Sequence, residues 1–320
     1  MVTQRGRPLS SRDRPVVTIG NFDGLHHGHR AVIDQARHKA DQVGAPLAAL
    51  LFDPHPRAFF SPQQAPFLLT DIEHRCTLLR DAGVDSVLIA PFNKDFARVP
   101  AETFVNDFLA QRLGTQAVVV GADFRFGHRA AGDGAALQEW GRAKGIDVEL
   151  VAKAREDMGK EDDGGEVFAS RRIRAALREG RPGQAARALG RVWTIRARVV
   201  RGEQRGRTLG YPTANLPWPK DIVMPAFGVY AVQVTLPDGT LREGVASFGV
   251  RPMFPAPPAA EVYLFDFTGN LYDQMLIVHW HTYLREEQRF EDIDALKSQM
   301  AQDVHAARAA LETPFAREDG

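Results

Sequence analysis

Two histidines and three glycines lie close together near the start of the chain, where a run of β-branched residues gives way to a helical pattern. The histidines are His26 and His29, and the glycines are Gly20, Gly24 and Gly28. Glycine lets the backbone approach a bulky group, and the first N–H groups of a helix attract phosphate. The two histidines can face one pocket and donate to anionic oxygens. The pattern favours nucleotidyl transfer, in which fixed donors stabilise the attacked phosphate and the departing pyrophosphate.

The histidine pair also fits roles without catalysis. Histidines at such a spacing occur on protein surfaces and in cores, and these residues alone do not decide between the roles. A zinc site fits less well, because no set of Cys, Asp or Glu ligands nearby would complete it.

A second cluster suited to phosphate chemistry lies further along the chain. Gly206 and Gly210 allow a tight loop over phosphates, with Arg207 between them. Thr213 and Asn215 are two residues apart, so their side-chain oxygens can point the same way and bind Mg²⁺. The same residues also fit an ordinary turn, because Gly, Pro, Thr and Asn are common in loops.

Alternating strands and helices must position the first cluster. Strands are predicted at residues 15–20, 47–52, 86–90, 116–120 and 148–151, and helices at residues 28–43, 73–82, 101–113 and 133–145. This alternation indicates βαβ units and a parallel sheet. The first cluster then follows the first strand, where α/β folds bind ligands.

Strands without intervening helices follow in the second half. Helices are predicted at residues 170–177 and 184–189, strands at 194–200, 228–236, 242–248, 261–267 and 275–280, and a final amphipathic helix at 293–311. Such strands indicate an antiparallel sheet or a small barrel. We therefore predict two domains, residues 1–185 and 186–320. Segments 156–166 and 255–260 are predicted to be loops.

Composition narrows the class of protein. The 40 basic and 40 acidic residues cancel, which argues against a general nucleic-acid binder. No apolar run approaches the length of a membrane-spanning helix, and the polar N-terminus is unlike a secretory signal. The single cysteine, Cys76, lies on a helical face, so we predict a buried thiol and a cytoplasmic protein. Arginines crowd residues 171–207, either on solvated helix faces or, for a few of them, facing phosphates.

The first cluster resembles the nucleotidylyltransferases, whose signature is His-x-Gly-His. The longer segment from Gly20 to His29 is similar to their flavin-adenylating branch, the bacterial bifunctional riboflavin kinase/FAD synthetases, and residues 52–56 and 121–127 match the same family. The resemblance implies that His26 and His29 are catalytic and that ATP or its phosphates contact Gly20, Asn21, Phe22, Asp23, Gly24 and Gly28. It implies that flavin contacts Phe52, Pro54, His55, Pro56, Asp123, Phe124 and Phe126. The last two phenylalanines could also serve the core, and the prolines could stiffen a loop.

A further segment, residues 169–174, stands where the family has a phosphate-binding Ser-Ser-Thr-x-Ile-Arg. The resemblance implies phosphate contacts for Ser170 and Arg174. Ala169 and Arg171 replace a serine and a threonine, so two hydroxyl contacts to ATP are lost, and Arg171 offers a charged contact instead.

The second cluster resembles the Gly-Arg-x-Leu-Gly-Tyr-Pro-Thr-Ala-Asn segment of riboflavin kinases. The resemblance implies that nucleotide and Mg²⁺ are bound by Gly206, Arg207, Gly210, Thr213 and Asn215.

It also aligns Glu261 with the carboxylate that deprotonates the ribityl hydroxyl as this attacks the γ-phosphate. Arg251 and Arg285 are implied to bind flavin. Departures from the family pattern are Val250, Met253 and Tyr263, the last replacing a histidine.

The resemblance covers residues 16–311 and implies a complete architecture. An α/β Rossmann-like nucleotidyltransferase domain with a parallel sheet precedes a small antiparallel six-stranded β-barrel riboflavin kinase domain with a C-terminal helix. The implied reactions are phosphorylation of riboflavin by ATP to FMN and adenylylation of FMN by ATP to FAD, with Mg²⁺ as cofactor and FMN and FAD as bound products. Neither nucleic acid nor membrane is an expected partner, and weak self-association is left open.

Three alternatives are kept. One of the two activities could be lost. Adenylylation is the candidate for loss, because Ala169 and Arg171 depart from its phosphate-binding segment, whereas the kinase segment matches the family. The chain could bind flavin as a regulator without turnover, although the retained histidines and Glu261 argue against this. It could also be a nucleotidylyltransferase acting on a nicotinamide or pantetheine substrate, which the barrel-like second half disfavours.

Overall fold

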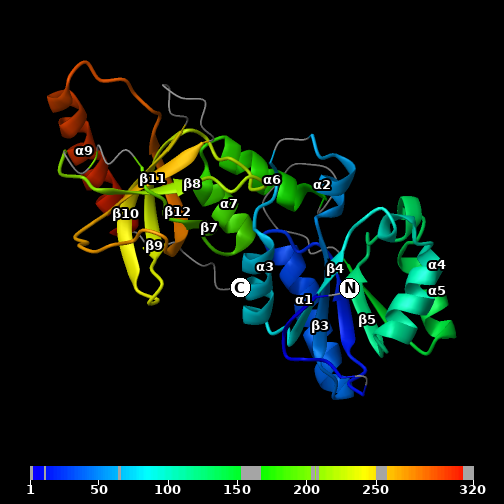
Figure 1. The fold of residues 1–320 in the computed structure, drawn as a ribbon. Coiled ribbons are helices and arrows are strands. Elements are labelled where there is room, and N and C mark those ends of the chain that lie inside the picture. Colours follow the sequence, from blue (N-terminus) through cyan, green and yellow to red (C-terminus); the bar gives the residue numbers. More distant parts are fainter. Residues whose placement is uncertain are drawn as a thin grey trace. The chain divides into compact units, whose positions relative to one another are not determined.

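The computed structural model of the chain describes residues 3–10, 12–63, 66–152, 167–202, 206, 209–249 and 258–312 (Figure 1). They form two compact units. The first unit consists of Met1–Gln64 and Ile72–Ala169, and the second of Ala65–Asp71 and Ser170–Gly320. Of the predicted loops, residues 156–166 and 255–257 lie outside the described residues. Ala259 and Ala260, which the sequence predicts as loop, begin a strand instead.

The first unit is built on a six-stranded sheet with the strand order β1-β4-β3-β2-β5-β6. The strands are β1 (Thr3–Gly6), β2 (Val16–Ile19), β3 (Leu47–Asp53), β4 (Ser86–Pro91), β5 (Ala117–Gly121) and β6 (Asp147–Val151). Neighbouring strands are parallel except β1 and β4, which confirms the predicted parallel sheet. The sequence does not predict the edge strand β1, because its residues are polar and largely exposed and carry no apolar pattern.

Helices cover both faces of this sheet, because alternate strand residues point to opposite sides. One core packs Val16 and Leu47 against α1 and α3, and the other packs Val17 and Leu50 against η2 and α5. Cys76 is buried in the first core, as predicted, and burial raises the pKa of its thiol. The helical elements are α1 (His27–Val43), α2 (Pro56–Phe60), α3 (Ile72–Asp81), η1 (Phe96–Arg98), α4 (Ala101–Thr103), the π-helix η2 (Phe104–Arg112), η3 (His128–Ala130) and α5 (Gly134–Ala143).

The second unit is built on a curled antiparallel sheet of six strands with the order β7-β12-β9-β10-β11-β8. The strands are β7 (Trp193–Arg198), β8 (Thr213–Pro217), β9 (Gly228–Thr235), β10 (Leu241–Gly249), β11 (Ala259–Leu264) and β12 (Met275–Arg285). An isolated bridge between Val200 and Asn215 joins β8 to the residues after β7, the two ends of this order. The sheet confirms the predicted fold class. Thr213 and Asn215, which the sequence also allowed as part of an ordinary turn within residues 206–215, lie in β8, whose five residues alternate too briefly to reveal a strand.

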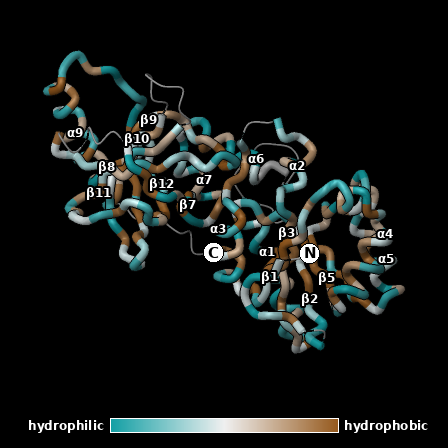
Figure 2. Tube along the Cα trace, in the orientation of Figure 1, coloured by the Kyte–Doolittle hydropathy of each residue, from teal (hydrophilic) through white to brown (hydrophobic). Residues whose placement is uncertain are grey.

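The two faces of this sheet have different tasks. One face buries the main apolar core, which includes Tyr230, Phe248 and Trp280. The other face lies under the C-terminal helix α9 (Ile293–Glu312), whose Ala307 and Leu311 pack against it. Figure 2 shows hydrophobic residues gathered along the strands of both units. Residues that alternate with the core on β9, β10, β11 and β12 pack with α9, namely Ala231, Val245, Tyr263 and Leu284.

Two helices and a segment from the first half of the sequence complete the second unit. The helices are α6 (Val167–Arg178) and α7 (Pro182–Leu189), both of which contribute to its core. Within residues 66–71, Leu68 forms a parallel bridge with Ile222, and the buried Leu69 accepts a hydrogen bond at its carbonyl from Trp193 Nε1, 2.9 Å away. The compact units divide the chain between Ala169 and Ser170, but a domain boundary defined by sequence similarity can lie elsewhere. The predicted domain boundary after residue 185 therefore stays a prediction.

Candidate functional site

The loop between β2 and α1 carries the first predicted cluster. His26 is the N-cap of α1, and its Nδ1 accepts the backbone N–H of His29 at 3.3 Å. The two imidazole rings stack with their centroids 3.6 Å apart. Because Nδ1 accepts this hydrogen bond, the neutral ring of His26 carries its proton on Nε2. The structure therefore brings the two predicted catalytic histidines together at the start of the helix.

This loop is tightly wound and anchored from within. Phe22 and Leu25 have φ of 46° and 45°, a left-handed conformation that side chains disfavour. Both side chains are buried in the core beside α1, which holds the conformation. At Gly20, a Cβ would lie 3.1 Å from the Phe22 ring, so glycine makes room for that ring. The loop is thus fixed before any substrate arrives.

A cavity of about 440 Å³, here called the aromatic cavity, opens where several parallel strands end. Gly20 and Asn21 line it after β2, and Phe52 at the end of β3. The Oδ1 atom of Asn21 is buried and accepts no hydrogen bond from the described residues. The rest of the wall is largely aromatic and includes Pro56, Phe60, Phe92, Phe96, Phe104, Phe124 and Phe126.

Phe124 and Phe126 contribute both to the core and to the wall of the aromatic cavity. Their rings stack with centroids 5.4 Å apart, and both pack with the core on one side while lining the cavity on the other.

Other residues predicted for this site lie elsewhere. His55 is the N-cap of α2 and accepts the backbone N–H of Arg57 at its Nδ1, 3.0 Å away. His55, Pro54 and Asp123 are not among the residues lining the aromatic cavity. Asp23 is buried, and its Oδ1 lies 3.8 Å from the guanidinium of Arg75, an equally buried residue of α3.

Ser170 and Arg174 lie on α6 and belong to the second unit. Arg174 Nε donates to the carbonyl of Phe67, and its guanidinium lies 5.4 Å from the Phe67 ring centre. Two further predicted site residues, Arg207 and Arg251, lie outside the described residues.

In the second unit, strand register brings the predicted residues together. Glu261 on β11 is paired with Asn215 on β8 and with Ser247 on β10. Tyr263 is paired with Thr213 in the same ladder. Thr213 and Asn215 are alternate residues of a strand and share a face, as their spacing predicts. The row therefore lies on the face of the sheet that α9 covers.

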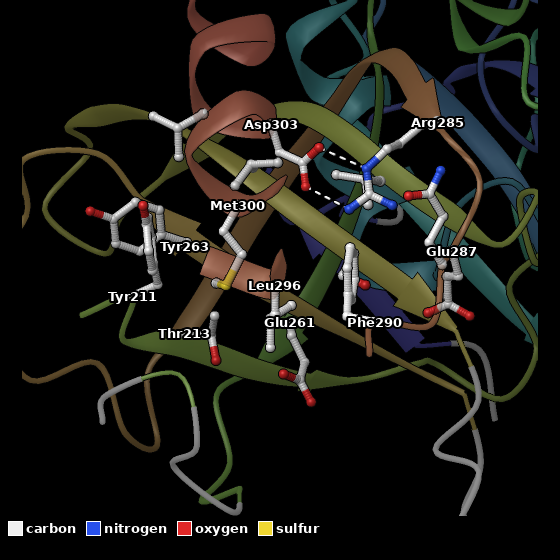
Figure 3. A pocket seen from close by; sticks show the side chains of 15 residues that line it. Tyr211, Thr213, Glu261, Tyr263, Arg285, Glu287, Phe290, Leu296, Met300 and Asp303 are labelled. Carbon is white, nitrogen blue, oxygen red and sulfur yellow. Dashed lines mark hydrogen bonds and ion pairs between the residues drawn. The ribbon is translucent and has the colours of Figure 1, made fainter. Parts of the chain in front are cut away.

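A cavity of about 290 Å³, here called the helix cavity, lies between this face and α9 (Figure 3). Thr213 and Glu261 line it from the sheet, and Leu296 and Met300 from the helix. Tyr263, which stands where the family has a histidine, also lines it and packs edge to face on Tyr211 with ring centroids 5.2 Å apart. The helix contributes mainly apolar side chains to the cavity, and the sheet contributes both polar and apolar ones.

A neighbouring cavity of about 600 Å³, here called the turn cavity, is bounded by the turn before β12. Its lining includes Arg201, Pro212 and Tyr272, and it shares Thr213 with the helix cavity. The guanidinium of Arg201 lies 5.3 Å from the Tyr272 ring centre. Thr213 therefore lines both cavities.

A second carboxylate, Glu287, lines the helix cavity beside Glu261. Burial raises the pKa of Glu287 and the charge of Glu261 adds to this, while Arg285 and a hydrogen bond from Ser247 act in the opposite direction. Its Oε1 would lie 2.2 Å from a Cβ at Gly249, so a side chain at that position would displace the Glu287 carboxylate. The sheet side of the cavity therefore carries concentrated negative charge.

Comparison with known proteins agrees with this division into two sites. A FAD synthetase family model matches residues 9–161, and a riboflavin kinase model matches residues 189–311. The bifunctional riboflavin kinase/FMN adenylyltransferase of Pseudomonas fluorescens is 42% identical over 92% of this chain and 92% of its own length. The protein of that name from Escherichia coli (strain K12) is 37% identical over 92% of this chain and 91% of its own. The chain belongs to the bifunctional riboflavin kinase/FMN adenylyltransferase family.

The family resemblance read from the sequence motifs is therefore confirmed. A crystal structure described as a macrolide-efflux protein from Streptococcus pneumoniae shares the fold, with a TM-score of 0.80 and 29% identity over 93% of this chain and 95% of that one. Within the described residues, no helix combines the length and apolar character needed to cross a membrane. The same residues contain no group of three or more His, Cys, Asp or Glu able to hold a metal.

Several residues around the two sites of this family member are not predicted from sequence. Arg75, Glu287 and Asp303 reach their positions only through long-range contacts, and no local pattern marks them. The aromatic wall could have been predicted from the sequence, because Phe92, Phe96 and other phenylalanines are concentrated in the segments that follow the strands.

Proposed function

We propose that the second unit transfers the γ-phosphate of ATP to riboflavin and that the first unit transfers AMP from a second ATP to the resulting FMN. The observation that carries the proposal is that Thr213 lines both the helix cavity and the turn cavity, while Glu261 lines the helix cavity. A flavin in one cavity and a nucleotide in the other would bring an acceptor hydroxyl and a donor phosphate together.

In the kinase reaction, the ribityl hydroxyl oxygen attacks the γ-phosphorus and ADP departs with the broken bond's electron pair. Glu261 accepts the hydroxyl proton from the sheet side of the helix cavity. Thr213 and Asn215 offer neutral oxygens. Such oxygens fit Mg²⁺, because this ion usually takes most of its ligands from phosphates and water rather than from the protein. When bound with ATP, Mg²⁺ would supply positive charge that neutralises the phosphate oxygens. Gly206, Gly210 and Arg207 keep their predicted role in nucleotide binding, and Arg251 its role in flavin binding.

In the adenylyl transfer, a phosphate oxygen of FMN attacks the α-phosphorus of ATP and pyrophosphate departs. The flat flavin ring suits the aromatic cavity, whose stacked phenylalanines offer planar contacts. The buried acceptor of Asn21 can be satisfied by a donor of the bound substrate. His26, His29 and the first N–H groups of α1 stabilise the developing negative charge. Gly24 and Gly28 are proposed to contact phosphates. Ser170 and Arg174, which belong to the second unit, keep their predicted role in phosphate binding.

Two weaker alternatives make different predictions. A chain with one lost activity would make FMN but no FAD, and Arg171, exposed on α6, would be the residue to restore to threonine. A flavin-binding regulator would bind riboflavin without consuming ATP. A cytoplasmic location, weak self-association and the lack of nucleic-acid binding stay predictions.

The test is a chromatographic time course of the purified chain with riboflavin, ATP and Mg²⁺. FMN should appear first and FAD should follow, and FAD should form directly when FMN is supplied. FMN without FAD would reject the adenylyl-transfer half, and flavin binding without any product would reject both halves.

A further inference from the structure

The guanidinium of Arg285, at the end of β12, is engaged by the protein itself. Its Nε and Nη2 donate to Oδ1 and Oδ2 of Asp303 on α9, each at 2.7 Å (Figure 3). Its Nη1 donates to the carbonyl of Glu286 at 2.8 Å, and the ring of Phe290 lies 6.0 Å from its centre. A fork-to-fork pair of this kind fixes the direction of both side chains. Arg285 also lines the helix cavity, where the sequence resemblance implied that it binds flavin.

Asp303 has little capacity left for another partner. Its side chain is 9% exposed, and Oδ1 also accepts a hydrogen bond from Gln299 Nε2 at 3.0 Å. A buried carboxylate with its arginine removed is strongly disfavoured, so the two charges stabilise each other in this position. The pair is therefore a fixed link between β12 and α9.

The position of this link along α9 matters. Asp303 is the first buried residue of the helix, and the residues before it, 293–302, are exposed or half-buried. After it, Ala307 and Leu311 are buried against the sheet. The half of α9 that covers the helix cavity, through Leu296 and Met300, thus lacks the apolar anchoring of the other half.

We propose that residues 293–302 form a lid over the riboflavin cavity and that the Arg285–Asp303 pair is the anchor that sets its position. Arg285 and Asp303 are then positioning residues for riboflavin, acting through Leu296 and Met300. This rests on the proposed kinase function, because it assumes that riboflavin occupies the helix cavity. The lid covers the flavin and leaves the turn cavity alone, so the anchor governs the KM for riboflavin and not the KM for ATP.

The first test is Asp303→Asn, which removes the charge and keeps the side-chain shape. We expect the KM for riboflavin to rise about tenfold, with the KM for ATP unchanged and kcat within about threefold. The matched control is Asp266→Asn. It removes the Arg308–Asp266 pair, which also holds α9, has the same 2.7 Å separation and has 43% and 80% exposed side chains. The control should leave the KM for riboflavin unchanged.

A double-mutant cycle separates this anchor from the direct flavin contact that the sequence resemblance implied for Arg285. If Arg285 acts only through Asp303, adding Arg285→Gln to Asp303→Asn should raise the KM for riboflavin little beyond the larger single effect. If the fold-increases in the KM for riboflavin of the two single variants multiply in the double variant, the proposal is wrong. That result would show that Arg285 binds flavin on its own.

Further outcomes keep the anchor distinct from the proposed function. An unaltered chain that makes no FMN rejects the kinase function itself. With an active unaltered chain, an Asp303→Asn variant whose KM for riboflavin changes less than about twofold rejects the anchor. An equal rise in the KM for ATP also rejects it, as a general loss of folding. Should Asp303→Asn not fold, Gln299→Ala keeps the ion pair and should give a smaller rise in the KM for riboflavin alone.

Discussion

The two sites hold their functional side chains in different ways. In the first unit, one tightly wound loop and the start of α1 position His26 and His29 within a single short segment of sequence. In the second unit, Asn215 and Glu261 lie on different strands and are brought together because β8 and β11 pair in a particular register. The comparison teaches that a loop-built site can be read locally, whereas a register-built site depends on pairings between distant segments.

The difference also predicts how each site fails. The loop is held by Phe22 and Leu25, so damage there should remain local to nucleotidyl transfer. The second site depends on the sheet and on α9, so changes that loosen either should reach its substrates. The variants below test this separation, beginning with the largest expected effect.

Replacing Glu261 by Gln should lower the rate of FMN formation by about 10²–10⁴-fold, because the ribityl hydroxyl loses its proton acceptor. FAD formation from supplied FMN should be unchanged. Both rates can be measured by chromatography of the flavins in the same preparation. A fall in both would contradict the separation of the two sites.

Replacing His29 by Ala should lower FAD formation by about 10²–10³-fold, because a donor to the developing phosphate charge is lost. The matched control is His27→Ala, since His27 lies on the same turn of α1 with an exposed side chain. FMN formation should be normal in both variants. Equal effects of the two changes on FAD formation would show that the loss reflects the helix start rather than the stacked histidines.

Much of the first unit can be predicted from sequence, for a physical reason. Strands of a parallel sheet are buried on both faces, so residues 47–52 and 117–120 form continuous apolar runs in the sequence. The polar edge strand β1 and the five-residue β8 give no such signal. Glu287, Asp303 and Arg75 are ordinary charged residues in sequence, and only the fold gives them partners.

For residues 66–71, the position in the sequence does not indicate the unit to which they belong. Its sequence lies between helices of the first unit, yet its contacts are with Ile222 and Trp193 of the second. Leu69→Ala should destabilise the second unit by about 2–5 kcal/mol through a cavity in its core. Leu68→Ala, at a partly buried neighbour, should cost less. Unfolding followed by the fluorescence of Trp193, Trp218 and Trp280 measures both, and equal losses would contradict the core position of Leu69.

The histidines of β12 differ from those of the first site, because their role is structural rather than catalytic. Burial lowers the pKa of His279 to about 4, with the charge of His281 adding to this, and His279 Nε2 lies 2.8 Å from Thr235 Oγ1. The unfolded chain, with an ordinary histidine pKa of about 6.5, binds the proton more readily than the folded chain. Stability of the second unit is therefore complete above pH 6.5 and falls as the pH drops toward 4.

Linkage sets the loss from His279 at about 1.4 kcal/mol at pH 5.5 and about 3 kcal/mol at pH 4. Denaturant unfolding at a series of pH values measures it. His279→Gln, which keeps a polar side chain beside Thr235 and does not titrate, should flatten the profile between pH 6.5 and 4 relative to the unaltered chain. An identical slope in the two chains would assign the acid sensitivity to other groups, such as His281, whose pKa burial also lowers.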